Sequence, residues 1–160
     1  MATSAVPAAI DALLSILTEA SKRAGSALAN TQIFDGPALT NLEFGRRLFV
    51  GWQPEADNAA ALTQDFAYAG ARRRDEEFQI SCYAEVESGD TDMQPLRTAA
   101  FALVAVVETE LRASDDAPTA PTLNGTVLWA HLTTGNLQQG QTLAGAAAGV
   151  AFTISCRSRL

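Results

Sequence analysis

The sequence predicts an α+β fold, in which a mainly antiparallel sheet of four to six strands packs against two helices. Two segments carry apolar residues at helical spacing, and several others alternate apolar and polar residues as half-buried strands do. Along the chain these segments follow the order helix, several strands, helix, strands. With 160 residues, of which 48% are hydrophobic, the chain can bury a core of its own, and we expect one domain over residues 1–160.

The first expected helix lies near the start of the chain. Ser4 is suited to cap it, and Pro7 is tolerated in its first turn because the amides there need no partner within the helix. We expect the helix to end at Gly25. Its apolar stripe consists of Ile10, Leu13, Leu14 and Leu17.

Short strands are expected in the next part of the chain. Residues 31–34 and 48–52 are rich in β-branched and aromatic side chains, and residues 61–68 are a further candidate. The polar, proline-containing residues 53–58 are expected to form a surface loop, and residues 70–74 a turn.

Residues 77–87 have one of the two clearest strand patterns in the chain, because every second side chain is apolar. A second helix follows, which Asp92 is suited to cap and which carries Pro95 in its first turn. Its apolar stripe consists of Leu96, Ala100, Leu103, Val107 and Leu111. Phe101 and Val104 flank this stripe, so we expect the helix to be covered on more than one side.

The last third of the chain is expected to contain two more strands, at residues 126–133 and 150–157. A turn is expected at residues 135–136, because they are Gly-Asn. Residues 137–145 are rich in glutamine and glycine, and we expect them to form either a loop or an extended arm that reaches a neighbouring chain.

Charge and composition narrow the function classes. Eighteen acidic against eleven basic residues give a formal net charge of −7, which disfavours binding to a phosphate backbone. Cys82 and Cys156 are too few for a disulfide framework. The start shows no signal peptide, and the longest apolar stretch, residues 99–107, is too short to span a membrane. We therefore expect a soluble protein made in the cytoplasm, without contact to a membrane.

Catalytic and cofactor motifs are missing from the sequence. The single histidine, His131, lies in an expected strand, so it is more simply explained as a structural residue than as part of a catalytic triad. No pair of histidines or cysteines has metal-ligand spacing, and no phosphate-binding loop occurs. We expect neither an enzyme nor a bound cofactor or metal.

Several residues are instead candidates for an interface. Trp129, His131 and Tyr83 are expected to point away from the core face of their strands, where another subunit or a helix would cover them. For Trp129, packing under the first helix is an equally weighted alternative. The run of Arg72, Arg73 and Arg74 precedes three acidic residues, and such a turn either neutralises itself in solvent or docks on complementary charges of a partner.

The sequence as a whole resembles the tail terminator proteins of long-tailed, non-contractile bacteriophages, especially those of actinobacterial hosts. The resemblance rests on IDAL at 10–13, LFVGW at 48–52, GARRRDE at 70–76 before FQI at 78–80, and FTISCRSRL at 152–160 after QT at 141–142 and GA at 145–146. It implies a non-enzymatic virion protein that assembles as a ring, commonly six-fold, on the head-proximal end of the tail. Such a ring ends polymerisation of the tail tube protein and joins the tail to the head connector.

The resemblance and the residue patterns together give the expected contacts. Arg72, Arg73, Arg74, Trp129 and Trp52 are the expected subunit and tube contacts, along with the arm at 137–145. Genomic DNA is expected to pass through an acidic lumen without specific binding. Two alternatives remain: another neck component, such as a head-completion or tail-completion protein, and a small-molecule binding module with a pocket between helix and sheet.

Overall fold

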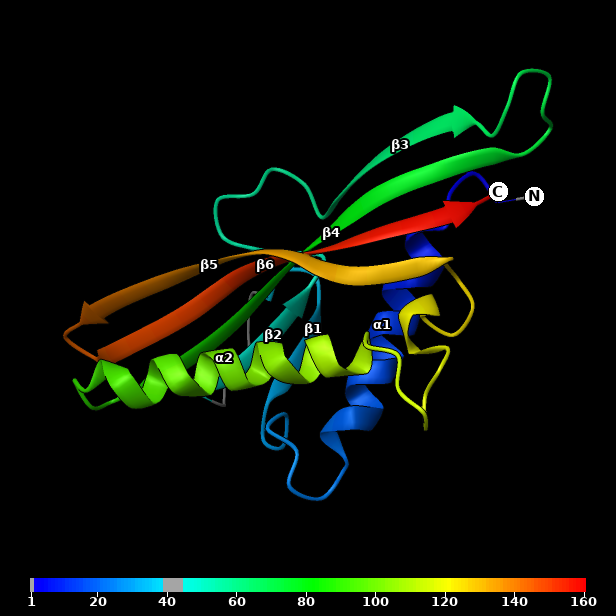
Figure 1. The fold of residues 1–160 in the computed structure, drawn as a ribbon. Coiled ribbons are helices and arrows are strands. Elements are labelled where there is room, and N and C mark those ends of the chain that lie inside the picture. Colours follow the sequence, from blue (N-terminus) through cyan, green and yellow to red (C-terminus); the bar gives the residue numbers. More distant parts are fainter. Residues whose placement is uncertain (1, 39–44) are drawn as a thin grey trace.

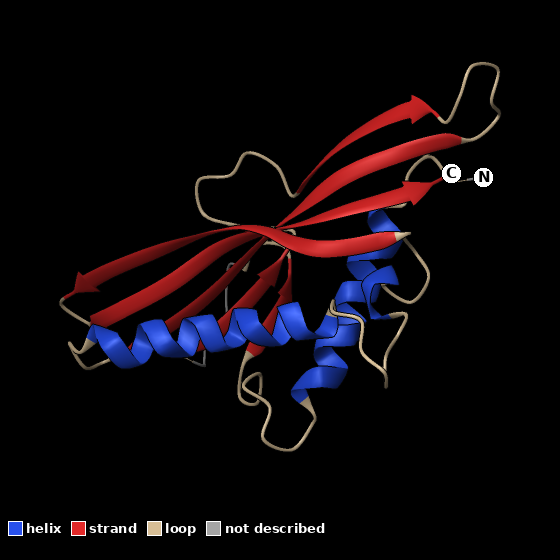
Figure 2. Cartoon of the chain, in the orientation of Figure 1, coloured by secondary structure: helices blue, strands red, loops and turns tan. Residues whose placement is uncertain are grey.

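The computed structural model describes residues 2–38 and 45–160. In these residues the fold consists of two α-helices, one short 3-10 helix and six strands (Figure 1, Figure 2). In chain order they are α1 (Val6–Ser21), β1 (Gln32–Asp35), β2 (Arg46–Val50), β3 (Ala60–Phe66), β4 (Arg74–Ser88), α2 (Met93–Glu110), the short 3-10 helix η1 (Ala120–Thr122), β5 (Trp129–Thr142) and β6 (Gly145–Arg159). The sheet is mainly antiparallel and both helices pack on one face of it, so the expected α+β class is confirmed.

The sheet is organised around β4, which has a different neighbour on each edge. The strand order is β1-β2-β4-β6-β5; β1 and β2 are parallel, and the other described pairs are antiparallel. Strand β3 also pairs with β4, on the same edge as β2 but farther toward the start of β4. Val50 lies opposite Cys82 and Ala60 opposite Ile80, so the chain leaves the sheet at 51–59 and returns to the same edge.

Strands β4 and β6 form the centre of the molecule. They pair from Asp75–Arg159 to Ser88–Ala146. The five apolar side chains expected on the buried face of β4 are buried, but Ser81 and Tyr83 of the opposite face are buried as well, so the expected polar face was wrong at these two positions. Their helix-facing side chains are buried: Phe78, Ile80, Cys82, Ala84 and Val86 from β4, and Ala146, Ala148, Val150, Phe152, Ile154 and Cys156 from β6. These apolar side chains form one core cluster with the buried side chains of both helices.

Helix α1 begins after Ala5, and the Ser4 hydroxyl accepts a hydrogen bond from the Val6 amide at 3.1 Å. Leu13 and Leu17 of its apolar stripe are buried. The helix ends at Ser21, so the expected end at Gly25 was wrong; residues 22–25 already form turns.

Helix α2 begins as expected, because the Asp92 carboxylate accepts a hydrogen bond from the Gln94 amide at 3.2 Å. Its expected stripe is buried, and so is the flanking Val104. Phe101 is about half exposed, so the expectation that both flanks are covered was wrong for that side chain. Within residues 2–38 and 45–160, neither helix is long and apolar enough to cross a membrane.

The expected turn at 135–136 and the loop or arm at 137–145 were wrong. The chain continues through both as β5, and it turns only at 143–144 before β6 begins. A bulge between Leu132 and Thr134 shifts the register midway along β5. Glycine and glutamine give no apolar alternation, so backbone pairing with β6 determines this half of the strand and the side-chain pattern does not reveal it.

The start of β5 also differs from the expectation. Residues 122–127 form a turn, in which the Val127 amide bonds to the Thr122 carbonyl at 3.1 Å, and the strand begins at Trp129 instead of residue 126. Val127 is therefore buried and Leu128 exposed, the reverse of the expected alternation. From Ala130 onward the expected order holds, with Ala130 inside.

Candidate interaction surfaces

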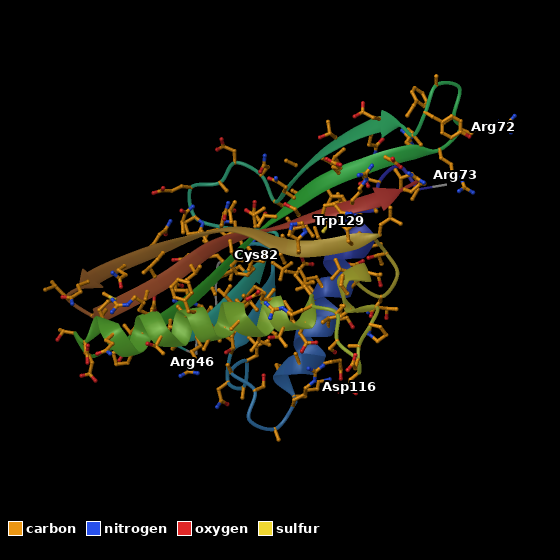
Figure 3. All side chains as sticks on the ribbon, in the orientation of Figure 1. Arg46, Arg72, Arg73, Cys82, Asp116 and Trp129 are labelled. Carbon is orange, nitrogen blue, oxygen red and sulfur yellow. The ribbon has the colours of Figure 1, made fainter. Side chains whose placement is uncertain are left out.

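The arginine run lies at the far end of the β3–β4 hairpin, which projects beyond the body of the molecule (Figure 1, Figure 3). Arg72 and Arg73 are exposed in the turn and form no ion pair with any residue that the structure describes. Arg74 is already part of β4, and its Nη1 donates to Oε1 of Gln64 at 2.9 Å. The run is therefore two free cations followed by one cation bound within the hairpin.

Two aromatic side chains at this tip were missed by the sequence reading. Phe66, the last residue of β3, is 72% exposed, and Tyr68 in the turn is 71% exposed. Both fell inside the strand expected at 61–68, but β3 ends at Phe66 and is exposed along most of its length. Apolar and polar residues do not alternate in residues 61–68, and this pattern already indicated that neither face of the segment packs on a core.

The acidic residues that follow the arginine run do not neutralise Arg72 or Arg73. Asp75 accepts hydrogen bonds from Arg159 Nε at 2.6 Å and from Arg157 Nη2 at 3.2 Å. These contacts, chiefly the hydrogen bond from Arg159, hold the pKa of Asp75 below its ordinary value. Because Asp75 is paired with β6, the self-neutralising turn considered from sequence was wrong for this residue.

Glu76 fixes the base of the hairpin. Its carboxylate is fully buried and accepts hydrogen bonds from the Ala5 amide at 2.8 Å, Gln64 Nε2 at 2.8 Å and the Ser158 hydroxyl at 3.1 Å. Burial alone would raise the pKa of Glu76, but these bonds and one from Ser4 outweigh it and lower the pKa below its ordinary value. One carboxylate thus joins the start of α1 to β3, β4 and β6.

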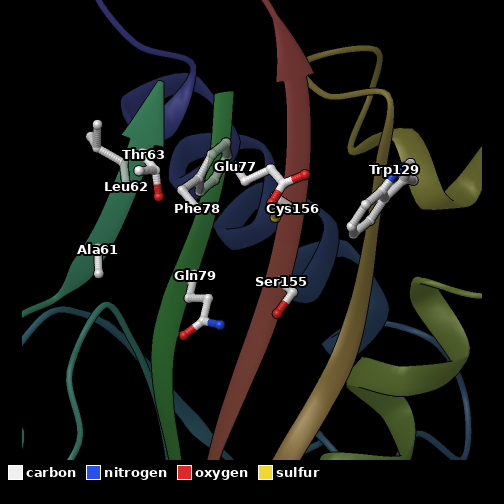
Figure 4. Close-up of a pocket in the computed structure, with 9 residues that line it drawn as sticks. All are labelled: Ala61, Leu62, Thr63, Glu77, Phe78, Gln79, Trp129, Ser155 and Cys156. Atoms are coloured by element: carbon white, nitrogen blue, oxygen red, sulfur yellow. The ribbon is translucent and has the colours of Figure 1, made fainter. Parts of the chain in front are cut away.

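Trp129 and His131 lie together on the outer face of β5, with ring centroids 5.0 Å apart. Trp129 is partly exposed and His131 is exposed. In Figure 4 the blue coil of α1 lies behind the sheet, and Trp129 borders a groove on the near side, so the alternative that Trp129 packs under the first helix was wrong. In the described part of the chain, the imidazole of His131 has no hydrogen bond or ion pair.

The groove beside Trp129 runs across the outer face of the sheet and has a volume of about 470 Å³. Its lining residues come from β3, β4, β5 and β6 (Figure 4). They are Ala61, Leu62, Thr63, Glu77, Phe78, Gln79, Trp129, Ser155 and Cys156. Leu62 is half exposed, so the groove presents apolar surface next to an acidic side chain.

Tyr83 does not need a neighbouring subunit or another helix to cover it, so that expectation was wrong. It is 6% exposed and packs in a second, smaller cluster with Phe49 and Ala151, against which Phe34 and Trp52 also pack. Strand β2 ends at Val50, so the expectation that Trp52 lies within a strand at 48–52 was wrong. The ring centroid of Trp52 is 5.9 Å from that of Tyr83. Burial, followed by the charge of Glu85, raises the pKa of Tyr83 to about 12.

The two cysteines are unsuited to chemistry. Cys82 and Cys156 are free and buried, and burial raises the pKa of each thiol to about 12. The thiolate, which is the reactive form, is therefore disfavoured at neutral pH. Across residues 2–38 and 45–160, no group of three histidine, cysteine, aspartate or glutamate residues could hold a metal ion.

Strand β5 forms an open edge of the sheet, and its outer half is exposed. Side chains tie this half to α2 and to the segment just before it: Arg97 Nη1 donates to Gln139 Oε1 at 2.9 Å, and Gln141 Nε2 donates to the Thr91 carbonyl at 2.8 Å. The β5–β6 hairpin is therefore held against the helix layer along its length (Figure 1).

No family model and no curated protein matches this sequence.

Proposed function

We propose that this protein is a virion structural protein that forms a ring on the head-proximal end of a phage tail tube, ends tube polymerisation and joins the tail to the head. One observation carries the proposal beyond the sequence resemblance. The β3–β4 hairpin projects beyond the body of the molecule, and it ends in two exposed aromatic rings and two arginines that form no ion pair with the part of the chain that the structure describes. Such side chains contribute little to folding and are typical of interfaces.

A ring explains how a small domain can stop a polymer. Copies that contact one another head to tail form a closed ring when the rotation between them closes. One face of that ring binds the last layer of tube protein, while the other face lacks the surface that a further layer needs. We propose six copies, as the resemblance implies.

The charge of the chain suits a passage for DNA. The formal net charge is −7, and unpaired carboxylates repel a phosphate backbone. Genomic DNA then moves through the lumen without specific binding. If neutralising the carboxylates that line the lumen leaves DNA retention and ejection unchanged, this part of the proposal fails.

The proposed function is tested by imaging tails that assemble without this protein. Negative-stain microscopy should show tubes of uncontrolled length, and supplying the wild-type protein should restore one length. Tails of normal length in its absence would contradict the proposal. A further arm separates it from the nearest rival, another neck component: a terminator binds finished tails in the absence of heads.

A small-molecule binding module is a second candidate, favoured by the groove between Leu62 and Trp129. A monomeric protein whose midpoint of thermal unfolding rises with a ligand would support this candidate. The Trp129→Ala variant should then lose the ligand-dependent rise while keeping its own midpoint.

A further inference from the structure

We infer that the tip of the β3–β4 hairpin docks on the 51–59 loop of a second copy of this chain, so that neighbouring subunits in the assembly contact head to tail. The tip is defined as Phe66, Tyr68, Arg72 and Arg73. The acceptor loop is residues 51–59, which connects β2 to β3. This inference deepens the proposed function and rests on it only in the assumption that copies of the chain assemble.

Charge complementarity identifies the acceptor loop. Glu55 and Asp57 are exposed there, and neither forms an ion pair with a residue that the structure describes. The tip offers two free guanidinium groups, Arg72 and Arg73, in the same condition. Two free cations on one element and two free carboxylates on another can pair only between chains, provided that the two elements lie apart within one chain.

The two elements do lie apart within one chain. Figure 1 shows the tip at the far end of the hairpin and the acceptor loop rising over the middle of the sheet, both on the side that the helices leave uncovered. When different patches of identical chains meet head to tail, repetition of the contact builds a ring or a filament. A two-fold dimer, in which each tip meets the other copy's loop, would instead close at two copies and would give only dimers on trapping, whereas a ring requires the contact to repeat.

Apolar surface also matches between the two elements. Phe66 and Tyr68 expose most of their rings at the tip. In the acceptor loop, Trp52 and Pro54 are half-buried and so keep part of their surface in solvent. Trp52 packs on Phe49, with ring centroids 4.8 Å apart, which anchors this surface on the sheet. An anchored tryptophan beside two carboxylates suits a partner that brings aromatic rings beside two arginines.

The chain contains a matched negative control. Asp115 and Asp116 are also adjacent, exposed and free of ion pairs with described residues. Their segment, residues 112–119, holds no aromatic side chain. It also includes Arg112, whose positive charge competes with a partner's arginines for the two carboxylates. Charge alone would make both acidic segments equal acceptors, whereas the inference selects residues 51–59.

Disulfide trapping tests the contact on the full chain. The variant R73C/D57C should form a ladder of covalent oligomers on mild oxidation, and a mixture of R73C with D57C should form a dimer holding one copy of each. The wild-type protein should form none, because Cys82 and Cys156 are buried. The control R73C/D116C should form no ladder. Oxidation is carried out on free protein and on purified tails, so that a ring that forms only on the tube is detected.

Three outcomes overturn the inference. These are monomers in both preparations, a ladder from R73C/D116C alone, or dimers from R73C alone as efficient as the mixed ones. Binding of duplex DNA that is lost in R72E/R73E, with no trapping, reassigns the tip to nucleic acid. If tails need this protein to reach one length but no trapping occurs, the inference is contradicted and the proposed function is not. If free protein forms the ladder but tails reach normal length without this protein, the proposed function is contradicted and the inference is not.

A charge swap gives an independent readout. R72E/R73E and E55R/D57R should each weaken self-association, by about tenfold or more, and the combination of all four changes should restore it. K22E/R112E changes the net charge as R72E/R73E does, at exposed residues elsewhere, and should leave self-association unchanged. Failure of the four-fold variant to recover any association contradicts the pairing.

Discussion

The paired part of strand β4 and the turn that joins it to β3 differ sharply in what they contribute to folding and to binding. From Glu76 to Val86 the strand has neighbours on both edges and packs under the helices, and this part contains all the buried residues of β4. At the other end, the turn between β3 and β4 carries largely exposed rings and two guanidinium groups that form no ion pair with a described residue. The first region determines whether the chain folds, and the second is free to bind a partner. The two regions can therefore be altered separately.

The largest expected difference is between a core residue and a tip residue. Phe152→Ala should lower the free energy of unfolding by about 4 kcal/mol, because it leaves a cavity where a fully buried ring packs between the sheet and the helices. Tyr68→Ala should change it by less than about 0.5 kcal/mol. Urea denaturation followed by circular dichroism measures both. Equal effects would contradict the division between the two regions.

The base of the hairpin is expected to belong with the core. Glu76→Ala should lower the free energy of unfolding by about 3 kcal/mol, because it leaves the Ala5 amide, Gln64 and Ser158 without their buried acceptor. Glu77→Ala, at the exposed neighbouring position, is the matched control and should cost little. Denaturant midpoints of the two variants compare them, and similar midpoints would remove the assigned role of Glu76.

The lowered pKa of Glu76 also predicts a pH dependence. Because the folded pKa lies below the ordinary value of 4.5, the stabilisation is complete above that value and is lost as the pH falls toward the folded pKa. Glu76→Gln should therefore show a shallower loss of stability below about pH 4.5. The midpoint of thermal unfolding recorded against pH tests this, and parallel curves for both proteins would contradict it.

Gly149 should reveal how closely the second aromatic cluster packs. A methyl group at this position would lie 2.0 Å from the Tyr83 hydroxyl oxygen, so Gly149→Ala should cost about 2 kcal/mol. In a Tyr83→Ala background the same change should cost much less, because the clash is gone. Additive costs in a double-mutant cycle would show that the two residues do not meet.

A small effect on stability, with a large effect on assembly, is expected at the arginines. Replacing Arg72, Arg73 and Arg74 with serine should leave the subunit folded, with a change below about 1 kcal/mol for loss of the exposed charges and the Gln64 bond. It should nevertheless impair the joining of tails to heads, because the contacts of the hairpin tip are lost. Normal yields of infectious particles would remove this role of the arginines.

The sequence predicts the interior better than the surface. Alternation in β4 and the stripe on α2 both predict burial, because a core imposes a period on the residues that face it. The outer half of β5 has no such period, and its pairing with β6 depends on the backbone, so the chain there looked like a loop or an arm.

Interface candidates were harder to locate from sequence. The arginines were found because they stand together in a turn, but the partners of Asp75 lie on β6, 82 and 84 residues away. Tyr83 was assigned to a surface that residues 51–59 and β2 actually cover, because alternation shows which face a side chain points to but not what lies above it. Phe66 and Tyr68 went unnoticed because their segment was assigned to a strand, although its lack of alternation favoured exposure.

Imaging of tails assembled in the absence of heads tests the central claim most directly. Averaged cryo-electron microscopy images should show one closed ring of this chain at a single end of the tube and nowhere along its length. Copies distributed along the tube, or tubes that end without any such ring, would contradict the account.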